Sequence, residues 1–557
     1  MPDTTPHLLA VENLAVEFHT SAGRVRAVRG VSWHLDRGET LAILGESGSG
    51  KSVSAAAVMG LIDSPPGHVT AGHVLFEGRD LLTITEEERR GINGRRIAMV
   101  FQDTLAALNP VYSVGWQITE AFRVHGVPRA QGRARALALL ERVGIPEAAH
   151  RFDDYPHQFS GGQRQRVMIA MALALRPDLL LADEPTSALD VTVQAGILAL
   201  LKELQAETGM GILLITHDLG IVAEFADRVA VMNGGEVVET GTAAAILRAP
   251  QHPYTKRLLA ALPGRGPLPA PRAHAEEPLL RVHELSKHYL VRRGMFGGTT
   301  GEVFRAVEGV SFELRQGETL GVVGESGSGK STVARTLLGL ETPTGGQMLY
   351  RGQDIAHATP AEMRRLRRQV QVVFQDPTAS LNPRMRIGEI IAEPWEIHPG
   401  VLPPSQRPAR VAELLEQVGL RPEHARRYPH QFSGGQRQRI AIARALALRP
   451  ELIICDEAVS ALDVSVQAQV IDLLKQLRAE YGLSFIFIAH DLPVVRDFAD
   501  RVLVMHRGRI VEQGPTAQIF GNPREAYTRN LISASPSLET GRRHAPPASL
   551  ASPIHAA

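Results

Sequence analysis

The chain of 557 residues contains 51 Gly, 36 Pro and one Cys, and 60 basic side chains balance 59 acidic ones. A hydrophobic content of 44% and a charged content of 21% are typical of a soluble globular protein. One Cys excludes an internal disulfide, a Cys-rich zinc site and an iron–sulfur cluster, and a net charge of +1 gives no general indication of nucleic-acid binding. No secretory signal is visible and no apolar stretch approaches the roughly 18 residues that cross a bilayer, so we expect a cytosolic chain without a membrane span.

The sequence contains an internal repeat that divides the chain into two similar halves. The segment Gly38–Ser52 returns almost unchanged as Gly317–Ser331, and Phe159–Arg166 returns as Phe432–Arg439. The spacing between the later motifs is the same in both copies, which indicates a duplicated fold. We therefore predict a first domain over residues 1–261 and a second over residues 279–533. A Pro-rich linker over residues 262–278 joins them, and a disordered tail follows over residues 534–557.

Continuous apolar runs in each half predict parallel strands that are buried on both faces. The runs of the first half are Thr40–Leu44, Leu179–Ala182 and Gly211–Thr216; those of the second half are Leu320–Val323, Leu452–Cys455 and Ser484–Ala489. Each run ends in the polar residues of a motif. Because open α/β sheets bind ligands at the carboxyl ends of their strands, this arrangement predicts an α/β fold with a site at that edge.

The first motif, GESGSGKS, follows a strand and precedes a helix in both halves, which is the context of a phosphate-binding P-loop. The backbone N–H groups of such a loop form a concave anion site, its lysine reaches the β- and γ-phosphates, and its serine hydroxyl binds Mg²⁺. The predicted ATP-binding residues here are Gly45, Ser47, Gly48, Ser49, Gly50, Lys51 and Ser52, and Gly324, Ser326, Gly327, Ser328, Gly329, Lys330, Ser331 and Thr332.

Acidic pairs and a histidine follow the next strands. Asp183 and Asp456 stand at strand ends, where a carboxylate can hold Mg²⁺, and Glu184 and Glu457 come directly after them, so that they point to the other side of the strand. A carboxylate in that place can polarise the attacking water. On its own such a pair also caps a helix, but a histidine at the end of the next strand favours catalysis. These histidines are His217 and His490.

The order of these motifs resembles the ATP-binding cassette (ABC) ATPases over nearly the whole chain. The SGGQ segments, the Asp–Glu pairs, the SALD segments that begin at Ser187 and Ser460, and the histidines carry the resemblance. It implies two tandem P-loop NTPase (RecA-like) nucleotide-binding domains, each with an antiparallel β subdomain and an α-helical subdomain. It also implies that each ATP is sandwiched between the P-loop of one half and the SGGQ of the other, a head-to-tail pairing within the chain.

The resemblance assigns residues to two sites. Gln102 and Gln375 join the catalytic residues and the metal ligands, and Phe18 and Tyr289 stack on adenine, although an aromatic residue at the end of an N-terminal strand is often part of the core. The first site combines Lys51, Ser52, Gln102, Asp183, Glu184 and His217 with Ser433, Gly434, Gly435 and Gln436; the second combines Lys330, Ser331, Gln375, Asp456, Glu457 and His490 with Ser160, Gly161, Gly162 and Gln163.

A finer resemblance is to the dipeptide, oligopeptide, glutathione and nickel import branch. It rests on Phe101–Pro110 and Phe374–Pro383, and on His252–Leu259; near the end of the second half only Tyr527 and Thr528 match the last of these. The implied function is the ATP-hydrolysing subunit of an importer. It would work with two transmembrane permease subunits and an external solute-binding protein, as a peripheral protein on the cytoplasmic face of the inner membrane. Dipeptides, oligopeptides and glutathione all remain open as cargo.

The alternative is a soluble ABC ATPase that acts on ribosomes or nucleic acid. Translation-factor forms carry a long charged helical linker, whereas this linker is short and rich in Pro, and DNA-repair forms carry zinc-binding Cys clusters. The basic runs Arg89–Arg96 and Arg364–Arg368 could bind nucleic acid or anionic lipid, but flanking polar residues favour solvated helix faces. We therefore expect no nucleic-acid partner.

Overall fold

The computed structural model describes residues 6–20, 23–186, 191–264, 266, 268, 277–292, 299–460 and 462–535. The chain divides into two compact units between Ala260 and Ala261, and the second unit runs to Ser535. Both units have the same architecture, a mixed α/β fold with a parallel sheet and a separate antiparallel sheet, which confirms the predicted fold class. The domain boundaries predicted from the sequence stay predictions, since most of the linker and nearly all of the tail lie outside the described residues.

The central sheet of the first unit has the strand order β10-β9-β3-β8-β7-β6. Strands β9, β3, β8, β7 and β6 are parallel, and β10 pairs antiparallel at one edge. The apolar run Thr40–Leu44 forms β3 with every residue buried. These strands are β3 (Thr40–Leu44), β6 (Ile97–Val100), β7 (Leu179–Asp183), β8 (Gly211–Thr216), β9 (Arg228–Asn233) and β10 (Glu236–Thr242).

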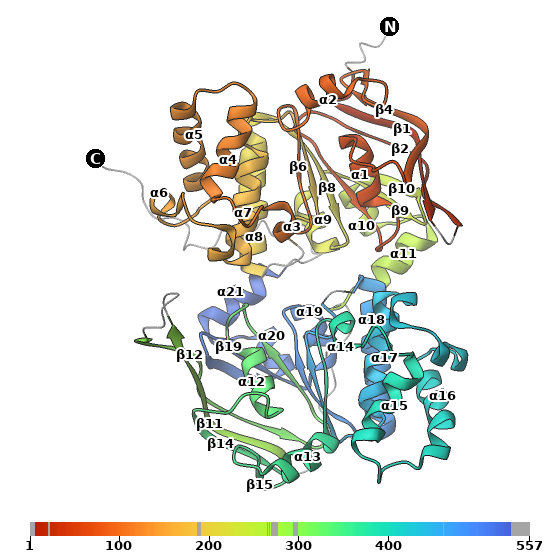
Figure 1. The fold of residues 1–557 in the computed structure, drawn as a ribbon, viewed down its shortest axis with the longest axis vertical. Helices are drawn as coiled ribbons and strands as arrows, with labels where there is room; N and C mark the ends of the chain where they lie inside the picture. The colour runs from red at the N-terminus through yellow and green to blue at the C-terminus, as the bar shows by residue number, and fades with distance from the viewer. Residues whose placement is uncertain are drawn as a thin grey trace. The chain divides into compact units, whose positions relative to one another are not determined.

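A second, antiparallel sheet of order β2-β1-β4-β5 packs on one side of this sheet, and helices pack on the other (Figure 1). Successive residues of β7 alternate between the two cores: Leu179 and Leu181 face the antiparallel sheet and α1, whereas Leu180 and Ala182 face the helices. The bounds are β1 (Leu9–Thr20), β2 (Gly23–Leu35), β4 (Gly67–Phe76), β5 (Arg79–Asp80), α1 (Lys51–Met59), α2 (Glu86–Ile92), α3 (Thr104–Ala107), α4 (Val114–Val124), α5 (Arg129–Arg142), α6 (Ala148–Arg151), α7 (Gly161–Ala172), α8 (Val191–Thr208), α9 (Leu219–Phe225), α10 (Ala243–Arg248) and α11 (Pro253–Ala260).

The second unit repeats this plan with sheets of order β16-β17-β18-β13-β19-β20 and β12-β11-β14-β15. Its strands are β11 (Pro278–Arg292), β12 (Thr299–Arg315), β13 (Thr319–Val323), β14 (Gly345–Tyr350), β15 (Gln353–Asp354), β16 (Val370–Val373), β17 (Leu452–Asp456), β18 (Ser484–Ile488), β19 (Arg501–His506) and β20 (Arg509–Pro515). Its helices are α12 (Lys330–Leu337), α13 (Pro360–Gln369), α14 (Pro377–Ser380), α15 (Ile387–Ile397), α16 (Arg407–Gln417), α17 (Gly434–Leu446), α18 (Val464–Tyr481), α19 (Leu492–Phe498), α20 (Thr516–Gly521) and α21 (Ala526–Ala534).

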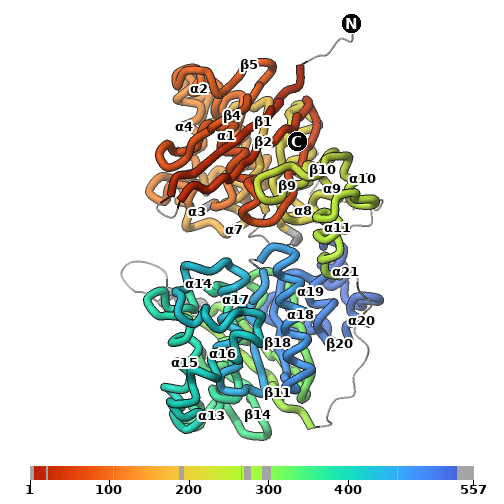
Figure 2. The backbone as a smooth tube through the Cα atoms, turned by 90° about the vertical axis from the view of Figure 1, so that its right-hand side faces the viewer, coloured from red at the N-terminus to blue at the C-terminus, as the bar shows by residue number. Residues whose placement is uncertain are grey.

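In each unit a short helix, α10 or α20, packs beside the antiparallel strand at the edge of the central sheet, β10 or β20. In Figure 2, α10 lies beside β9 and β10, and its N-terminus is capped by Thr242, whose hydroxyl accepts from the N–H of Ala245. The P-loop helices α1 and α12 lie at the carboxyl ends of β3 and β13. Across the part of the chain that the structure describes, no helix is long and apolar enough to span a membrane.

Candidate functional site

The loop between β3 and α1 has a shape that only glycine permits at several positions. Gly48 and Gly50 have φ values of +78° and +96°, in the left-handed region that favours glycine. A Cβ atom on Gly45 would lie 2.3 Å from the carbonyl oxygen of Met232, and one on Gly50 would lie 2.4 Å from that of Ala27. The neighbouring strands therefore press against this loop, and its conformation is set by both sequence and packing.

The P-loop lysine is buried and folded back over its own loop. The Nζ atom of Lys51 donates to the carbonyl oxygens of Gly45 and Glu46 at 2.7 and 2.9 Å. In the second unit Lys330 donates to Gly324 and Glu325 at 2.6 and 2.9 Å. An ammonium group that is held by neutral oxygen atoms of its loop can turn toward an anion at the helix N-terminus.

The serine after each lysine contacts the strand-end aspartate. Ser52 Oγ donates to Asp183 Oδ1 at 3.1 Å, and Ser331 Oγ donates to Asp456 Oδ1 at 3.0 Å. Burial raises the pKa of Asp183 and of Asp456, and the adjacent glutamates add to this effect. A buried carboxylate beside a hydroxyl oxygen is a donor set that suits Mg²⁺, whose charge would offset the cost of burying the anion.

A glutamate, a histidine and a glutamine meet beyond the aspartate. Glu184 accepts from Gln102 Nε2 at 2.8 Å, and its Oε1 lies 3.0 Å from His217 Nδ1. Burial opposes the ionised form of Glu184, but the hydrogen bonds with His217 and Gln102 and the charge of Lys51 outweigh it, so its pKa is lowered. Glu184 is therefore ionised at neutral pH, as a residue that accepts a proton from water must be.

The second unit brings the same three residue types together with one difference. Glu457 accepts from Gln375 Nε2 at 2.8 Å, whereas His490 Nδ1 lies 3.6 Å from Glu457 Oε2, beyond a hydrogen bond. The direct polar contact with His490 lowers the pKa of Glu457 against the opposing effect of burial, and the charges of His490 and Lys330 lower it further. Burial opposes the charged form of His490, but Glu457 and Asp491 raise its pKa.

The backbone turns sharply at each of these glutamates. Glu184 and Glu457 have φ values of +45° and +48°, and their N–H groups donate to Ile215 and Ile488 on the neighbouring strands at 2.9 and 3.0 Å. A non-glycine residue in the left-handed region costs conformational energy and persists where the surroundings hold it. This turn, and not the alternation of a regular strand, sends the carboxylates of Asp183 and Glu184 to different partners.

The SGGQ segments begin α7 and α17 as capping boxes. Ser160 Oγ accepts from the N–H of Gln163 at 3.3 Å, and Gln163 Oε1 accepts from the N–H of Ser160 at 3.1 Å; Ser433 and Gln436 repeat the pair at 3.4 and 3.1 Å. Both glutamines thus cap a helix, a role separate from the predicted contact with nucleotide, and S-x-x-Q is the sequence pattern of a capping box. The exposed serine hydroxyl still has its proton to donate.

The second glycine of each segment packs closely against the following helix. A Cβ atom on Gly162 would lie 2.7 Å from Val193 Cγ1, and one on Gly435 would lie 2.1 Å from Val466 Cγ1. A Cβ atom on Gly434, in contrast, would have no neighbour closer than Leu462 Cδ2, at 3.8 Å. The first glycine is therefore open to solvent, whereas the second lets two helices approach.

The aromatic residues predicted to hold adenine lie at the ends of β1 and β11. Phe18 is half-buried and packs against the core of the antiparallel sheet. Tyr289 is also half-buried, and Lys287 Nζ lies 4.9 Å from the centre of its ring. Their role as adenine platforms stays a prediction.

Ser187–Asp190 of the first SALD segment and Ala461 of the second lie outside the described residues.

The structure adds two tyrosines that sequence reasoning had named only as part of a family pattern. Tyr254 and Tyr527 contact the P-loops of their own units through their hydroxyls. The recurrence of a tyrosine near the end of both halves was a signal in the sequence that this residue has a role. No nearby residue indicated that its partner is the P-loop.

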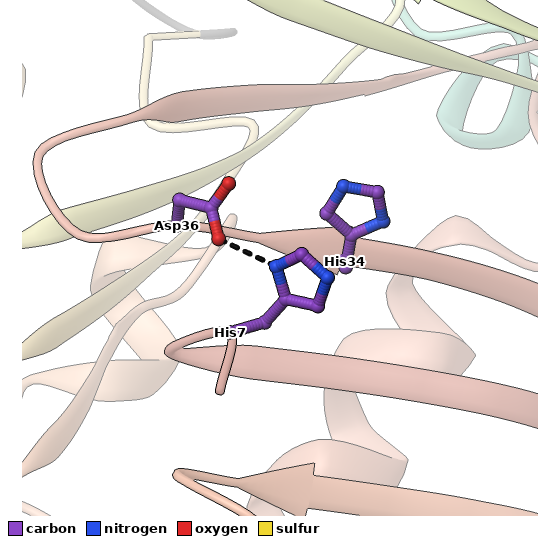
Figure 3. A group of neighbouring side chains, drawn as sticks. All are labelled: His7, His34 and Asp36. Atoms are coloured by element: carbon purple, nitrogen blue, oxygen red, sulfur yellow. Dashed lines mark hydrogen bonds and ion pairs between the residues drawn. The ribbon is translucent and has the colours of Figure 1, made fainter. Parts of the chain in front are cut away.

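His7, His34 and Asp36 form a separate cluster with metal-ligand chemistry in the first unit (Figure 3). His7 Nδ1 lies 2.6 Å from Asp36 Oδ1, and the two imidazole rings stack at 4.0 Å with an angle of 26° between them. The lone pair of a ring nitrogen lies in the plane of the ring, so stacked rings direct their lone pairs along nearly parallel planes and not toward one ion. The ion pair and the stack explain this cluster without a metal.

Comparison with known proteins agrees with these motifs. The family model described as "ABC transporter" matches residues 28–187 and 307–460, and the model described as "Oligopeptide/dipeptide transporter, C-terminal region" matches residues 238–286 and 511–556. The chain is 50% identical to the protein named glutathione import ATP-binding protein GsiA in Escherichia coli O157:H7 and in Shigella dysenteriae serotype 1 (strain Sd197). In both cases the alignment of 567 residues covers 96% of this chain and 91% of the relative.

A solved structure shows a more distant likeness. It is titled as a dimeric structure of a post-hydrolysis state of the ATP-binding cassette MJ0796 bound to ADP and Pi. Its sequence is 30% identical, with a TM-score of 0.38, and the match covers 42% of this chain and 98% of that one.

Proposed function

The chain belongs to the ABC transporter family and is an ATPase, and on that premise we propose that it drives the import of glutathione or short peptides through a separate membrane permease. The match to the oligopeptide/dipeptide transporter region carries the import assignment, and the repetition of one complete contact set supports ATP hydrolysis in both units. Both units pair a P-loop lysine with its loop, a serine with a strand-end aspartate, and a glutamine with a glutamate beside a histidine. Neither half has lost a polar group of the set.

Within each site the residues would divide the work of ATP hydrolysis. Lys51 and Lys330 would turn from the loop carbonyls to the phosphates. Mg²⁺ would be held by the serine and aspartate oxygens, with Gln102 and Gln375 as further ligands, and would supply charge neutralisation at the phosphates. Glu184 and Glu457 would take a proton from the attacking water, and His217 and His490 would orient these carboxylates.

Each ATP would also contact the SGGQ segment of the opposite unit. The exposed serine and first glycine at the start of α7 and α17 support this proposal, because a helix N-terminus with a free hydroxyl proton is suited to an anion. Completion of the site from a second unit would exclude water and strengthen the electrostatic interactions inside it.

The partners would be two permease subunits and an external solute-binding protein, with the chain peripheral on the cytoplasmic face of the inner membrane. The match to the oligopeptide/dipeptide transporter region and the name of the GsiA relatives support this assignment. In the first unit Phe101, which directly precedes Gln102, and Val111 and Tyr112 are exposed large apolar side chains that would be available to a permease helix.

Uptake in a deletion strain tests the proposal. Labelled glutathione, a dipeptide and a tetrapeptide would be offered to cells that carry the wild-type chain or the double variant Lys51→Ala/Lys330→Ala. We expect uptake of one cargo class to be lost in the deletion strain and restored by the wild type alone. Equal uptake of all three with either chain would overturn the importer assignment for these cargoes while leaving the ATPase activity to be measured separately on the purified protein.

A further inference from the structure

A tyrosine from the last helix of each unit reaches the P-loop. The hydroxyl of Tyr254, in α11, accepts a hydrogen bond from the backbone N–H of Glu46, with 3.3 Å between the two atoms. The hydroxyl of Tyr527, in α21, accepts from the N–H of Glu325 at 3.2 Å. The partners lie 208 and 202 residues apart in the chain, so the contact is made by the tertiary fold and occurs independently in both units.

The glutamate that donates its N–H group to each tyrosine also accepts a hydrogen bond from the P-loop lysine. The N–H of Glu46 bonds to Tyr254, while its carbonyl oxygen accepts from Lys51 Nζ at 2.9 Å. Glu325 makes the same two bonds with Tyr527 and Lys330, the second also at 2.9 Å. The tyrosine hydroxyl therefore restrains the residue from which the lysine must depart when phosphate arrives.

The position of each hydroxyl is itself well defined. The carboxylate of Glu239 accepts from the N–H groups of Gln251 and His252 just before α11, at 2.7 and 3.1 Å, and Glu512 does the same before α21 at 2.8 and 3.1 Å. Tyr254 is 6% exposed, and the ring of Tyr527 stacks on His506 at 4.0 Å. The residues just before α11 and α21 are thus anchored on β10 and β20, the strands that contain Glu239 and Glu512.

We propose that Tyr254 and Tyr527 are positioning residues of the two ATP sites, and that their hydroxyls preorganise the P-loops for the triphosphate. The inference rests on the proposed nucleotide site and gives the C-terminal segment of each unit a part in ATP binding. Without the hydroxyl, the amide of Glu46 or Glu325 loses this partner, and the loop gains orientations from which ATP must select one. Chemistry at the γ-phosphate involves other residues and changes little.

The test uses the full-length chain and the variants Tyr254→Phe and Tyr527→Phe, which remove the hydroxyl and keep the ring. We expect each to raise the KM for ATP by about 2- to 10-fold, the range for loss of one neutral hydrogen bond, with kcat changed less than about twofold. Equilibrium ATP binding isolates each site: Tyr254→Phe is compared with its parent in a Lys330→Ala background, and Tyr527→Phe in a Lys51→Ala background.

Leu258→Ala and Leu531→Ala are the matched controls, because these buried leucines lie on the same helices and leave the hydroxyls in place. They should lower the melting temperature at least as much as the tyrosine variants do and leave the KM for ATP unchanged. An unchanged KM in both tyrosine variants overturns the inference, and so does an equal rise in the leucine variants, which would assign the effect to helix docking. Retention of ATP binding by Lys51→Ala/Lys330→Ala would instead overturn the proposed nucleotide site.

Discussion

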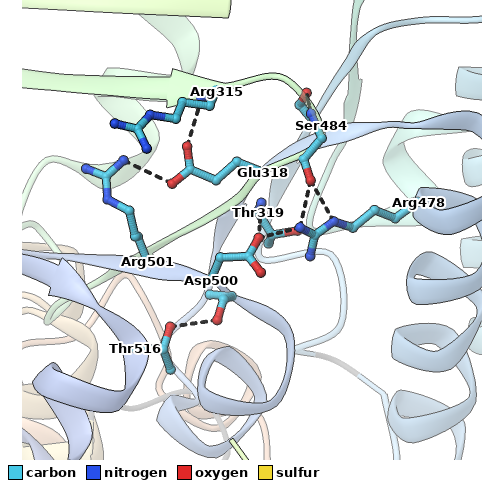
Figure 4. Close-up of polar contacts among 10 residues, drawn as sticks. Arg315, Glu318, Thr319, Arg478, Ser484, Asp500, Arg501 and Thr516 are labelled. Atoms are coloured by element: carbon cyan, nitrogen blue, oxygen red, sulfur yellow. Dashed lines mark hydrogen bonds and ion pairs between the residues drawn. The ribbon is translucent and has the colours of Figure 1, made fainter. Parts of the chain in front are cut away.

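Arg478 and Asp500 form a buried ion pair at the amino end of β13 (Figure 4). At the position of α8 that corresponds to Arg478 in α18, the first unit has the uncharged Gln205. The guanidinium of Arg478 also donates to the carbonyl oxygen of Gly317 at 2.6 and 2.9 Å, and Asp500 accepts from the N–H of Thr319 at 2.8 Å. In the first unit Gln205 bonds to Thr40 Oγ1, and Asp227 accepts from the N–H of Thr40. Asp227 is exposed to solvent and needs no cation, whereas the side chain of Asp500 is 8% exposed and is paired with Arg478.

Replacement of Arg478 should therefore destabilise the second unit through the carboxylate that is left behind. Arg478→Ala leaves Asp500 buried without this cation, and we expect a loss of about 3 to 5 kcal/mol in the free energy of unfolding. Arg478→Lys keeps the positive charge beside Asp500 and should cost clearly less. Urea unfolding of both variants measures the difference; equal losses would show that the charge of Asp500 is compensated elsewhere.

The double variant Glu184→Gln/Glu457→Gln should lower the kcat for ATP by about 10²- to 10⁴-fold, the usual contribution of a general base, and the two single variants should lower it to a similar extent as each other. The reason is that both glutamates are partly buried, bonded to a glutamine and ionised. Steady-state ATPase assays on the purified chain give the two values, with ATP binding as the control for an intact site. If one variant keeps near-normal turnover while the other is inactive, the two sites are not equivalent, and the difference in the distance of His217 and His490 from their glutamates becomes the feature to test.

Gly435→Ala should destabilise the second unit, whereas Gly434→Ala, one residue earlier, should not. The added methyl group would overlap Val466 Cγ1 at 2.1 Å in the first case and meet Leu462 at an ordinary 3.8 Å in the second. Val466 lies in α18, and a valine in a helix has one strongly preferred rotamer, so the overlap forces the helices apart at about 1 to 3 kcal/mol. Thermal unfolding compares the two variants directly, and equal melting temperatures would contradict the predicted overlap.

Acid should weaken the docking of α21 through Glu512. Burial opposes the charge of this residue, but hydrogen bonds from the N–H groups of Arg524 and Glu525 and the charge of Arg524 hold the pKa below its ordinary value of 4.5. A carboxylate with a lowered pKa stabilises the fold fully above its unfolded pKa, and this contribution is lost as the pH falls through the folded value.

The free energy of unfolding should therefore fall more steeply below about pH 4.5 in the wild type than in Glu512→Gln. Urea unfolding at several pH values between about 6 and 3.5 gives the two curves. Glu396→Gln, at an exposed position of α15, is the matched control and should follow the wild type. Parallel curves for the wild type and Glu512→Gln would show that the acid sensitivity does not arise from Glu512.

Some features of this protein were determined by local sequence. The apolar runs Thr40–Leu44 and Gly211–Thr216 form β3 and β8 with the predicted bounds, because a strand buried on both faces needs apolar residues without interruption. The P-loop followed from Gly48 and Gly50, whose positive φ values other residues rarely adopt. The family was equally readable, since its motifs are short and contiguous, and the family models confirm it.

Only the tertiary structure decided which distant groups meet. Tyr254 had no visible chemical role until folding placed its hydroxyl on Glu46, 208 residues away. The identity of Arg478 as one half of a buried ion pair depended in the same way on Asp500, which lies in the turn between α19 and β19. The physical reason is that periodicity and glycine conformation act over a few neighbouring residues, whereas a hydrogen bond across a sheet depends on where every intervening element packs.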